Sequence, residues 1–95
     1  MTEKVVVHSE ICDLLNALYE AKNHDYGDSF GKSYVEWGLP MVCIRLDDKL
    51  NRLKSFAKGA KQLVSDESID DTLMDLANYA IMTLIERRIA NEQQA

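Results

Sequence analysis

The chain reads Leu73-Met-Asp-Leu-Ala-Asn-Tyr-Ala-Ile-Met-Thr-Leu-Ile85 over its most apolar stretch, and this stretch decides the fold class. Its residues are all apolar apart from Asp75, Asn78 and Thr83. A helix that is hydrophobic on nearly every side is usually buried. The stretch therefore predicts an all-α protein built around this helix. It also places a carboxylate where an unpaired charge would be costly.

More acidic groups share the side of the predicted helix that carries Asp75. At about 100° per residue, Asp71, Asp75 and Asn78 fall within an arc of about 60°, with Glu67 at its edge. Stacked carboxylates repel one another, so a cation is expected beside them. One interpretation is Mg²⁺, which prefers oxygen ligands. The alternatives are that Glu67 and Asp71 only complement the helix N-terminus, and that Asp75 pairs with an Arg or Lys.

Helical spacing of apolar residues divides the chain into three expected helices, over 9–23, 40–58 and 66–91. Ser9 can cap the first helix, and Pro40 suits the first turn of the second. Gly59 can end the second helix. Ser68 and Asp71 resemble a capping box, so the regular part of the third helix is expected to start slightly after residue 66. Residues 1–8 are expected to form a tail, extended at Val5–Val7, and residues 24–39 a long ordered loop.

Length, charge and cysteine usage limit the class of protein. The 95 residues predict one all-α domain over 1–95 with a modest core, which a homo-oligomer would complete. A net charge of −5 argues against binding a nucleic-acid polymer or an anionic membrane. The run Val5–Val7 is too short for a signal peptide, and no stretch is long enough to span a bilayer. Cys12 and Cys43 lack CxxC spacing, so we expect buried, reduced thiols in a cytoplasmic protein.

A second group of charged residues lies on the helix over 40–58. The segment Arg45-Leu-Asp-Asp-Lys-Leu-Asn-Arg52 places its charges away from a stripe formed by Leu39, Cys43, Leu46, Leu50, Leu53 and Ala57. Such a mixture is ordinarily a solvated face with ion pairs one turn apart. Beside a helix that carries buried acids, Asp48 offers a further metal ligand. Arg45, Lys49 and Arg52 offer cations for phosphate oxygens.

A third group follows the first helix, in Lys22-Asn-His-Asp-Tyr-Gly-Asp28. Lys22 could meet phosphate, and Tyr26 or Trp37 could stack on a base. The alternative is a loop that Tyr26 anchors, with Asp25 making a local turn. His8 and His24 are isolated, so a zinc site is not expected.

Three segments together resemble a known family, the nucleotide-modification-associated domain type 1 of phages and of bacteria that carry phage genes. The segments are Lys22-Asn-His-Asp-Tyr-Gly-Asp-Ser29, Arg45-Leu-Asp-Asp-Lys-Leu-Asn-Arg-Leu53 and Glu67-Ser-Ile-Asp-Asp-Thr-Leu-Met-Asp-Leu-Ala-Asn-Tyr-Ala-Ile81. They occur in the order that the family has, and the resemblance covers roughly residues 10–90. The third segment is the most specific.

That family in turn looks like a relative of the all-α nucleoside triphosphate pyrophosphohydrolases typified by MazG and the dimeric dUTPases. The resemblance implies Mg²⁺ bound by acidic pairs from two helices, and cleavage between the α- and β-phosphates. Asp71 and Asp75 match the second pair, supplemented by Glu67. Only Asp48, followed by Asn51 or Arg52, stands where the first pair is expected. The incomplete first acidic pair departs from the family pattern, and this affects the expectation of hydrolysis more than the expectation of nucleotide binding.

The sequence therefore predicts a phage-type, cytoplasmic protein that binds a (d)NTP or related nucleotide through Mg²⁺ and hydrolyses it to the monophosphate and pyrophosphate. The expected metal ligands are Asp48, Glu67, Asp71 and Asp75, with Glu67 or Asp71 as the catalytic base. The expected nucleotide contacts are Lys22, Asp25, Tyr26, Arg45, Lys49, Arg52 and Asn78. Two alternatives remain at this point. One is a non-catalytic nucleotide binder; the other is a small interaction protein in which Asp75 pairs with Arg45 or Arg52.

Overall fold

The computed structural model describes residues 3–59 and 68–94, apart from the side chain of Tyr26. These residues form four helices: α1 (Lys4–Tyr26), α2 (Ser29–Trp37), α3 (Leu39–Ala57) and α4 (Ile69–Gln94). The all-α prediction is confirmed. The three expected helices are present with shifted ends, and α2 is an addition.

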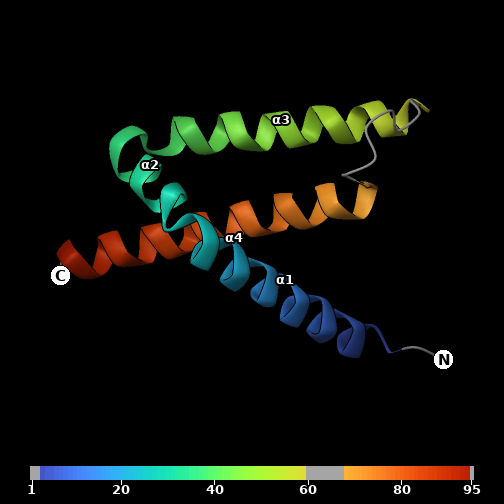
Figure 1. Ribbon diagram of the computed structural model, residues 1–95, viewed down its shortest axis with the longest axis horizontal. Coiled ribbons are helices and arrows are strands. Elements are labelled where there is room, and N and C mark those ends of the chain that lie inside the picture. Colours follow the sequence, from blue (N-terminus) through green and yellow to red (C-terminus); the bar gives the residue numbers. More distant parts are fainter. Residues whose placement is uncertain (1–2, 60–67, 95) are drawn as a thin grey trace.

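The two long helices α3 and α4 run antiparallel to each other, as Figure 1 shows. The C-terminal part of α1 crosses α4 near its middle, and α2 joins α1 to the start of α3. The N-terminal part of α1 projects away from the hairpin, so the molecule is elongated, with extents of 46 × 33 × 23 Å. Among the described residues, other helices therefore pack against only part of the circumference of α4, which leaves Leu73, Ile81 and Leu84 exposed.

The predictions of a tail over residues 1–8 and of a helix cap at Ser9 are wrong for the described residues, which begin at Glu3. α1 begins at Lys4 after Glu3, and the Val7 N–H donates to the Glu3 carbonyl at 3.2 Å. No proline or glycine interrupts the sequence before Gly27, so nothing prevents the helix from extending in both directions. Gly27 ends it with a φ of 67°, which glycine adopts without strain.

The long loop expected over residues 24–39 is also wrong, because α2 lies inside it. Asp28 caps α2, and its carboxylate accepts a hydrogen bond from the Gly31 N–H at 3.2 Å. Gly38 ends the helix, and its N–H donates to the Tyr34 carbonyl at 2.8 Å. Gly27 and Gly38 therefore serve as helix boundaries within the segment that was expected to be a loop.

The expected signals at the ends of α3 and α4 are confirmed. Pro40 lies in the first turn of α3, and Gly59 follows its end with a φ of 84°. The capping box at the start of α4 is complete. The Ser68 N–H donates to Asp71 Oδ2, and the Asp71 N–H donates to Ser68 Oγ, each at 3.1 Å.

A small core forms where α2, α3 and α4 meet. Its buried residues are Phe30, Met41 and Val42, with Tyr34, Leu46, Tyr79 and Met82 packed against them. The predicted burial of α4 on every side and of the two cysteines is wrong for the single chain: Leu84 is 65% exposed, and Cys12 and Cys43 are exposed. The physical reason for α4 is that the described helices cover only part of its circumference, which leaves its outward apolar residues exposed.

None of the helices in the described residues combines the length and the hydropathy needed to cross a lipid bilayer.

Candidate functional site

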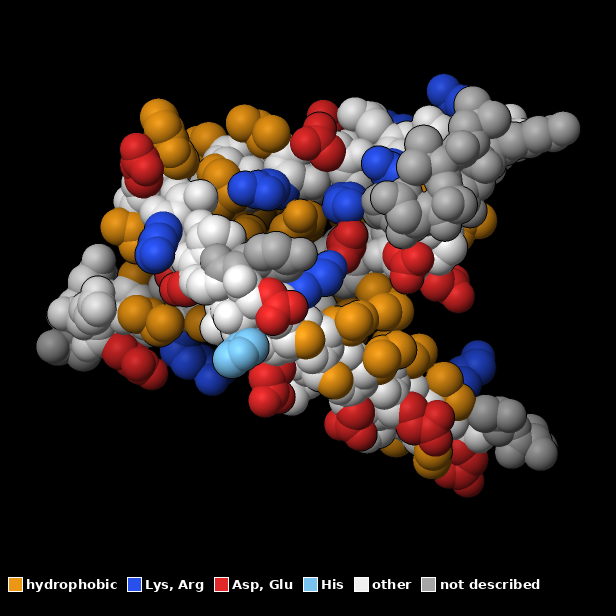
Figure 2. Space-filling view, viewed as in Figure 1, with side chains coloured by type: hydrophobic (Ala, Val, Ile, Leu, Met, Phe, Trp, Pro, Cys, Tyr) orange, Lys and Arg blue, Asp and Glu red, His pale blue; other side chains and the backbone are white. Residues whose placement is uncertain are grey.

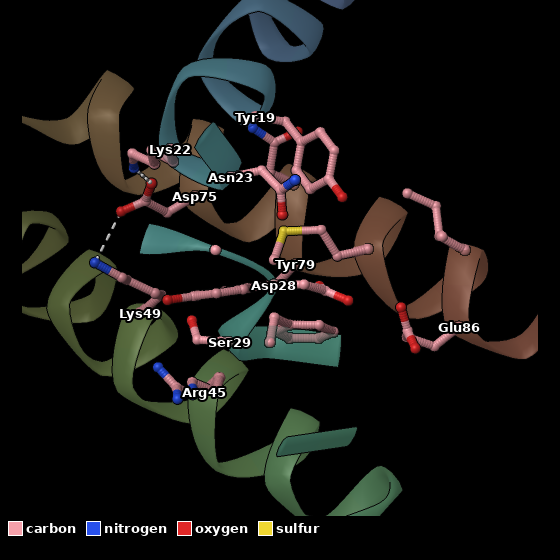
Figure 3. A pocket seen from close by; sticks show the side chains of 15 residues that line it. Tyr19, Lys22, Asn23, Asp28, Ser29, Arg45, Lys49, Asp75, Tyr79 and Glu86 are labelled. Atoms are coloured by element: carbon pink, nitrogen blue, oxygen red, sulfur yellow. Dashed lines mark hydrogen bonds and ion pairs between the residues drawn. The ribbon is translucent and has the colours of Figure 1, made fainter. Parts of the chain in front are cut away.

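A pocket of about 350 Å³ opens between the end of α1, the start of α2 and the facing sides of α3 and α4 (Figure 3). Its lining is mixed in chemistry, with cations, carboxylates, amides and aromatic rings: Tyr19, Lys22, Asn23, Gly27, Asp28, Ser29, Phe30, Arg45, Lys49, Asp75, Asn78, Tyr79, Met82, Ile85 and Glu86. The volume falls in the range of small-molecule sites. The pocket is therefore large enough for a ligand of nucleotide size.

Asp75 joins three helices at one end of this pocket. Lys49 Nζ from α3 lies 2.8 Å from Asp75 Oδ2, and Lys22 Nζ from α1 lies 3.3 Å from Asp75 Oδ1. The Asp75 side chain is 25% exposed, whereas that of Lys22 is 61% exposed. Each carboxylate oxygen thus has its own ammonium partner, and the pair to Lys49 is the shorter and the less exposed.

The environment of Asp75 favours its charged form. Partial burial by itself would raise the pKa of Asp75. The hydrogen bond from Lys49 and the positive charges of Lys22 and Lys49 outweigh that effect, so the pKa lies below its ordinary value. Asp75 is therefore an anion at neutral pH.

The predicted alternative of an ion pair between Asp75 and an Arg or Lys is confirmed in the single chain. The specific partners named for it, Arg45 and Arg52, are wrong. Lys22 and Lys49 hold the carboxylate instead, because the crossing of α1 over α4 brings Lys22 beside Asp75.

Arg45 is the third cation of the pocket. It is exposed and lies one turn before Lys49 on α3, with its side chain on the same side of the pocket (Figure 3). Within the described part of the chain, its guanidinium makes neither a hydrogen bond nor an ion pair. A guanidinium in a pocket presents a planar fork of donors that suits a phosphate or carboxylate.

Aromatic rings form another wall of the pocket. Phe30 and Tyr79 stack with ring centroids 6.0 Å apart and an interplanar angle of 18°. Phe30 is 7% exposed and belongs to the core, whereas Tyr79 is half-buried and lines the pocket with Tyr19. The core thus fixes the position of an aromatic surface beside the cations.

Two carboxylates lie away from the ammonium groups, at the start of α2 and on α4. Figure 3 shows Glu86 across the pocket from Lys22 and Lys49, with Asp28 between them. Burial raises the pKa of Glu86, and the nearby charge of Asp28 raises it further. The pocket therefore has a positive end and a negative end.

Asn78, predicted to touch a nucleotide, has a structural bond as well as a place in the pocket lining. Its Nδ2 donates to the Leu15 carbonyl at 3.2 Å and so ties α4 to α1. The bond uses one donor of the carboxamide and leaves its oxygen without a hydrogen bond among the described residues.

The predicted metal ligands do not gather in the described part of the chain. Asp75 lines the pocket, but Asp48 and Asp71 are exposed and do not line it. The Asp71 carboxylate accepts the capping bond from Ser68. No three His, Cys, Asp or Glu side chains among the described residues are placed to hold a metal ion together. Glu67 lies outside the described residues.

Other predicted contacts also lie away from the pocket. Asp25 and Arg52 do not line it, and Trp37 is 65% exposed at the end of α2. Tyr26 is the last residue of α1, and its side chain is outside the description.

Several lining residues were not identified from the sequence, namely Tyr19, Asn23, Ser29, Phe30, Tyr79, Met82, Ile85 and Glu86, and Asp28 was seen only as part of a charged segment. A signal for some of them was present. The face that carries Asp75 and Asn78 continues at helical spacing through Tyr79, Met82 and Glu86. Residues on α1 and α2 carried no comparable signal, because their nearness depends on the turn at Gly27.

Comparison with protein families matches residues 22–86 to the family described as nucleotide modification associated domain 1. The chain belongs to this family. The matched range is more than half of the chain, and it contains all the residues that line the pocket except Tyr19. The family resemblance expected from the sequence is thereby confirmed, and the family's description associates the domain with nucleotides. Searches of curated proteins and of solved structures found no match.

Proposed function

We propose that this protein binds a phosphorylated nucleotide in the pocket between α1, α2, α3 and α4. The observation that carries the proposal is the combination of a cationic end, formed by Lys22, Arg45 and Lys49, with the aromatic surface of Tyr79 beside it. Ammonium and guanidinium groups recognise phosphate, and aromatic rings stack on bases. The family description supports the same ligand class.

The cations at the positive end of the pocket can bind a phosphate group reversibly. Lys22, Arg45 and Lys49 line this end together with the carboxylate of Asp75, although the whole chain has a net charge of −5. Lys22 is largely exposed and can turn from Asp75 toward a phosphate without leaving a buried charge unpaired. Arg45 needs no such exchange, since no described residue pairs with it.

Binding without turnover is the form of this function that the geometry supports best. Asp75 is engaged by two lysines, and the described acids do not form a metal cage. Mg²⁺ therefore enters the proposal as the ion that accompanies a nucleoside triphosphate, because Mg²⁺ is commonly held by one or two carboxylates together with substrate phosphates. Asp75 is the pocket's anionic oxygen donor nearest the lysines.

Hydrolysis to the monophosphate and pyrophosphate is the second candidate. It is favoured by the ionised state of Asp75 beside the cations, where a Mg²⁺–triphosphate would lie. We propose the MazG-like relationship and a phage-type origin together with this activity. We also propose a cytoplasmic location, because nucleoside triphosphates are present in the cytoplasm.

We also propose that the chain acts as a homo-oligomer. Large apolar side chains are exposed along α1 and on the outer side of α4, among them Val5, Ile11, Leu14, Ile81 and Leu84. Figure 2 shows hydrophobic side chains following α1 toward its N-terminus. A second copy would remove this surface from water.

The experiment that tests nucleotide binding is calorimetric titration of the purified protein with the common ribo- and deoxyribonucleoside triphosphates, with and without Mg²⁺. Chromatography of the same mixtures detects monophosphate and pyrophosphate. We expect at least one nucleotide to bind, and Lys22→Ala and Arg45→Ala each to weaken that binding by about ten-fold, the loss of one charge-assisted contact.

Matched controls separate pocket contacts from net charge. Lys4→Ala on α1 and Arg88→Ala on α4 remove the same charge from exposed residues outside the pocket. These two variants should bind as the wild type does. Absence of binding by every nucleotide would overturn the proposal, and equal weakening by all four variants would remove the pocket from it. Products in the wild-type mixtures would establish hydrolysis over simple binding.

A further inference from the structure

The negative end of the pocket is the feature that phosphate binding does not use. Glu86 and Asp28 line the same pocket as the cations, and Figure 3 shows Glu86 on the opposite side from Lys22 and Lys49. Tyr79, the ring proposed to meet the base, lies between the two ends. A nucleotide whose phosphates occupy the positive end would therefore direct its base toward the carboxylates.

No positively charged side chain in the described part of the chain pairs with either carboxylate. Among the described residues, the Glu86 carboxylate makes no hydrogen bond and no ion pair. Asp28 Oδ1 accepts the Gly31 N–H, and no lysine or arginine over residues 3–59 and 68–94 pairs with Asp28. Glu86 is half-buried, and ionised carboxylates accept hydrogen bonds but cannot donate them. A ligand that presents N–H donors would supply hydrogen bonds to these two carboxylates.

The protein gives Asp28 a fixed position. Its Oδ1 is held by the first turn of α2, and Gly31 leaves room for the carboxylate, because a Cβ at that residue would collide with it. A fixed acceptor discriminates between ligands better than a mobile one, since it cannot turn away from an unfavourable group.

We propose that the pocket selects nucleotides whose base carries an exocyclic amino group, with Glu86 and Asp28 as the acceptors that recognise it. This inference rests on the proposed nucleotide-binding function. Glu and Asp side chains accept from the N4 amino group of cytosine. The corresponding oxo group of uracil presents lone pairs to the same carboxylates and is repelled.

The test uses two pairs of nucleotides that differ only in an amino or an oxo group: CTP with UTP, and ATP with ITP. Calorimetric titration of the wild-type protein should give tighter binding of the amino member, by about ten-fold or more, in each pair that binds. Glu86→Gln replaces a carboxylate, which only accepts hydrogen bonds, by a carboxamide that also donates them. The ratio of the affinities for the amino and oxo nucleotides should therefore fall toward one. Asp28→Asn should reduce the preference while keeping the cap of α2, because Asn caps helices well.

Glu92→Gln is the matched control, since Glu92 is exposed on the same helix and does not line the pocket. It should leave both affinities and their ratio unchanged. Glu86→Gln should fold, because burial disfavours the charge that it removes. Thermal unfolding checks that Glu86→Gln is folded. If this variant is not folded, Asp28→Asn tests the base preference independently.

The outcomes separate the inference from the proposed function. Equal binding of the amino and oxo members, or a ratio that both pocket variants leave unchanged, would overturn base selection while nucleotide binding stands. No binding by these four nucleotides or by any other common nucleoside triphosphate would overturn both.

Discussion

Lys49 Nζ lies 2.8 Å from Asp75 Oδ2, so a side chain of α3 neutralises the central acid of α4. Lys22 reaches the other oxygen of the same carboxylate from α1. Asp75 thus has two roles that can be separated experimentally: it holds three helices together, and it occupies lysines that a phosphate would use.

Replacing Asp75 by Asn should lower the free energy of unfolding by about 1 kcal/mol, because the ion pairs that it removes are only partly shielded from water. The same change should tighten nucleotide binding in the absence of Mg²⁺, since Lys22 is released from Asp75 and a negative charge is lost from the pocket. Denaturant unfolding and calorimetry measure the two effects. If Asp75 instead holds Mg²⁺, the variant would lose Mg²⁺-dependent binding and gain no stability from added Mg²⁺.

The contribution of Asp75 to stability should depend on pH in the acid range. Its pKa in the folded state lies below the ordinary value of 3.8. A depressed pKa of an acid stabilises the folded state above the unfolded pKa, and that stability is lost as the pH falls through the folded pKa. The difference in unfolding free energy between wild type and Asp75→Asn should therefore be constant near neutral pH and shrink below about pH 3.8. A difference that grows on acidification would contradict the assignment.

Gly31→Ala should fail to give the stability of roughly 1 kcal/mol that alanine gains over glycine within a helix. The added Cβ would meet the Asp28 carboxylate and displace it from the Gly31 N–H. Loss of an N-cap typically costs about 1 kcal/mol, which thermal unfolding would detect. Asp28→Asn keeps the cap and should be close to wild type. If Gly31→Ala were more stable than the wild type by the full helix-propensity gain of about 1 kcal/mol, the cap would not hold Asp28 in place.

Leu84→Glu should shift the protein toward a smaller assembly. Leu84 is 65% exposed in the single chain, so a charge there costs little unless a second copy covers it. Light scattering at micromolar concentration should give an oligomer for the wild type and a lower mass for the variant. Gln93→Glu adds a charge at another exposed residue of α4 and serves as the control. A monomeric wild type would end the oligomer proposal.

The sequence by itself determined the features that depend on neighbours within one or two helical turns. The period of apolar residues identified the bodies of α1, α3 and α4. Pro40 and the Ser68–Asp71 capping box located helix starts. The need of Asp75 for a cation was also visible, because an acid within an apolar helix requires compensation wherever the chain goes.

Only the tertiary structure decided which groups meet. Lys22 is 53 residues away from Asp75 in sequence, and nothing local distinguishes it from Arg45 or Arg52 as a partner. The turn at Gly27 and the short α2 bring Asp28 and Phe30 to the face of α4 that carries Tyr79 and Glu86, which makes the pocket. Helix propensity and capping are set by local contacts, whereas a binding site joins residues distant in sequence. Its composition therefore depends on how the helices cross.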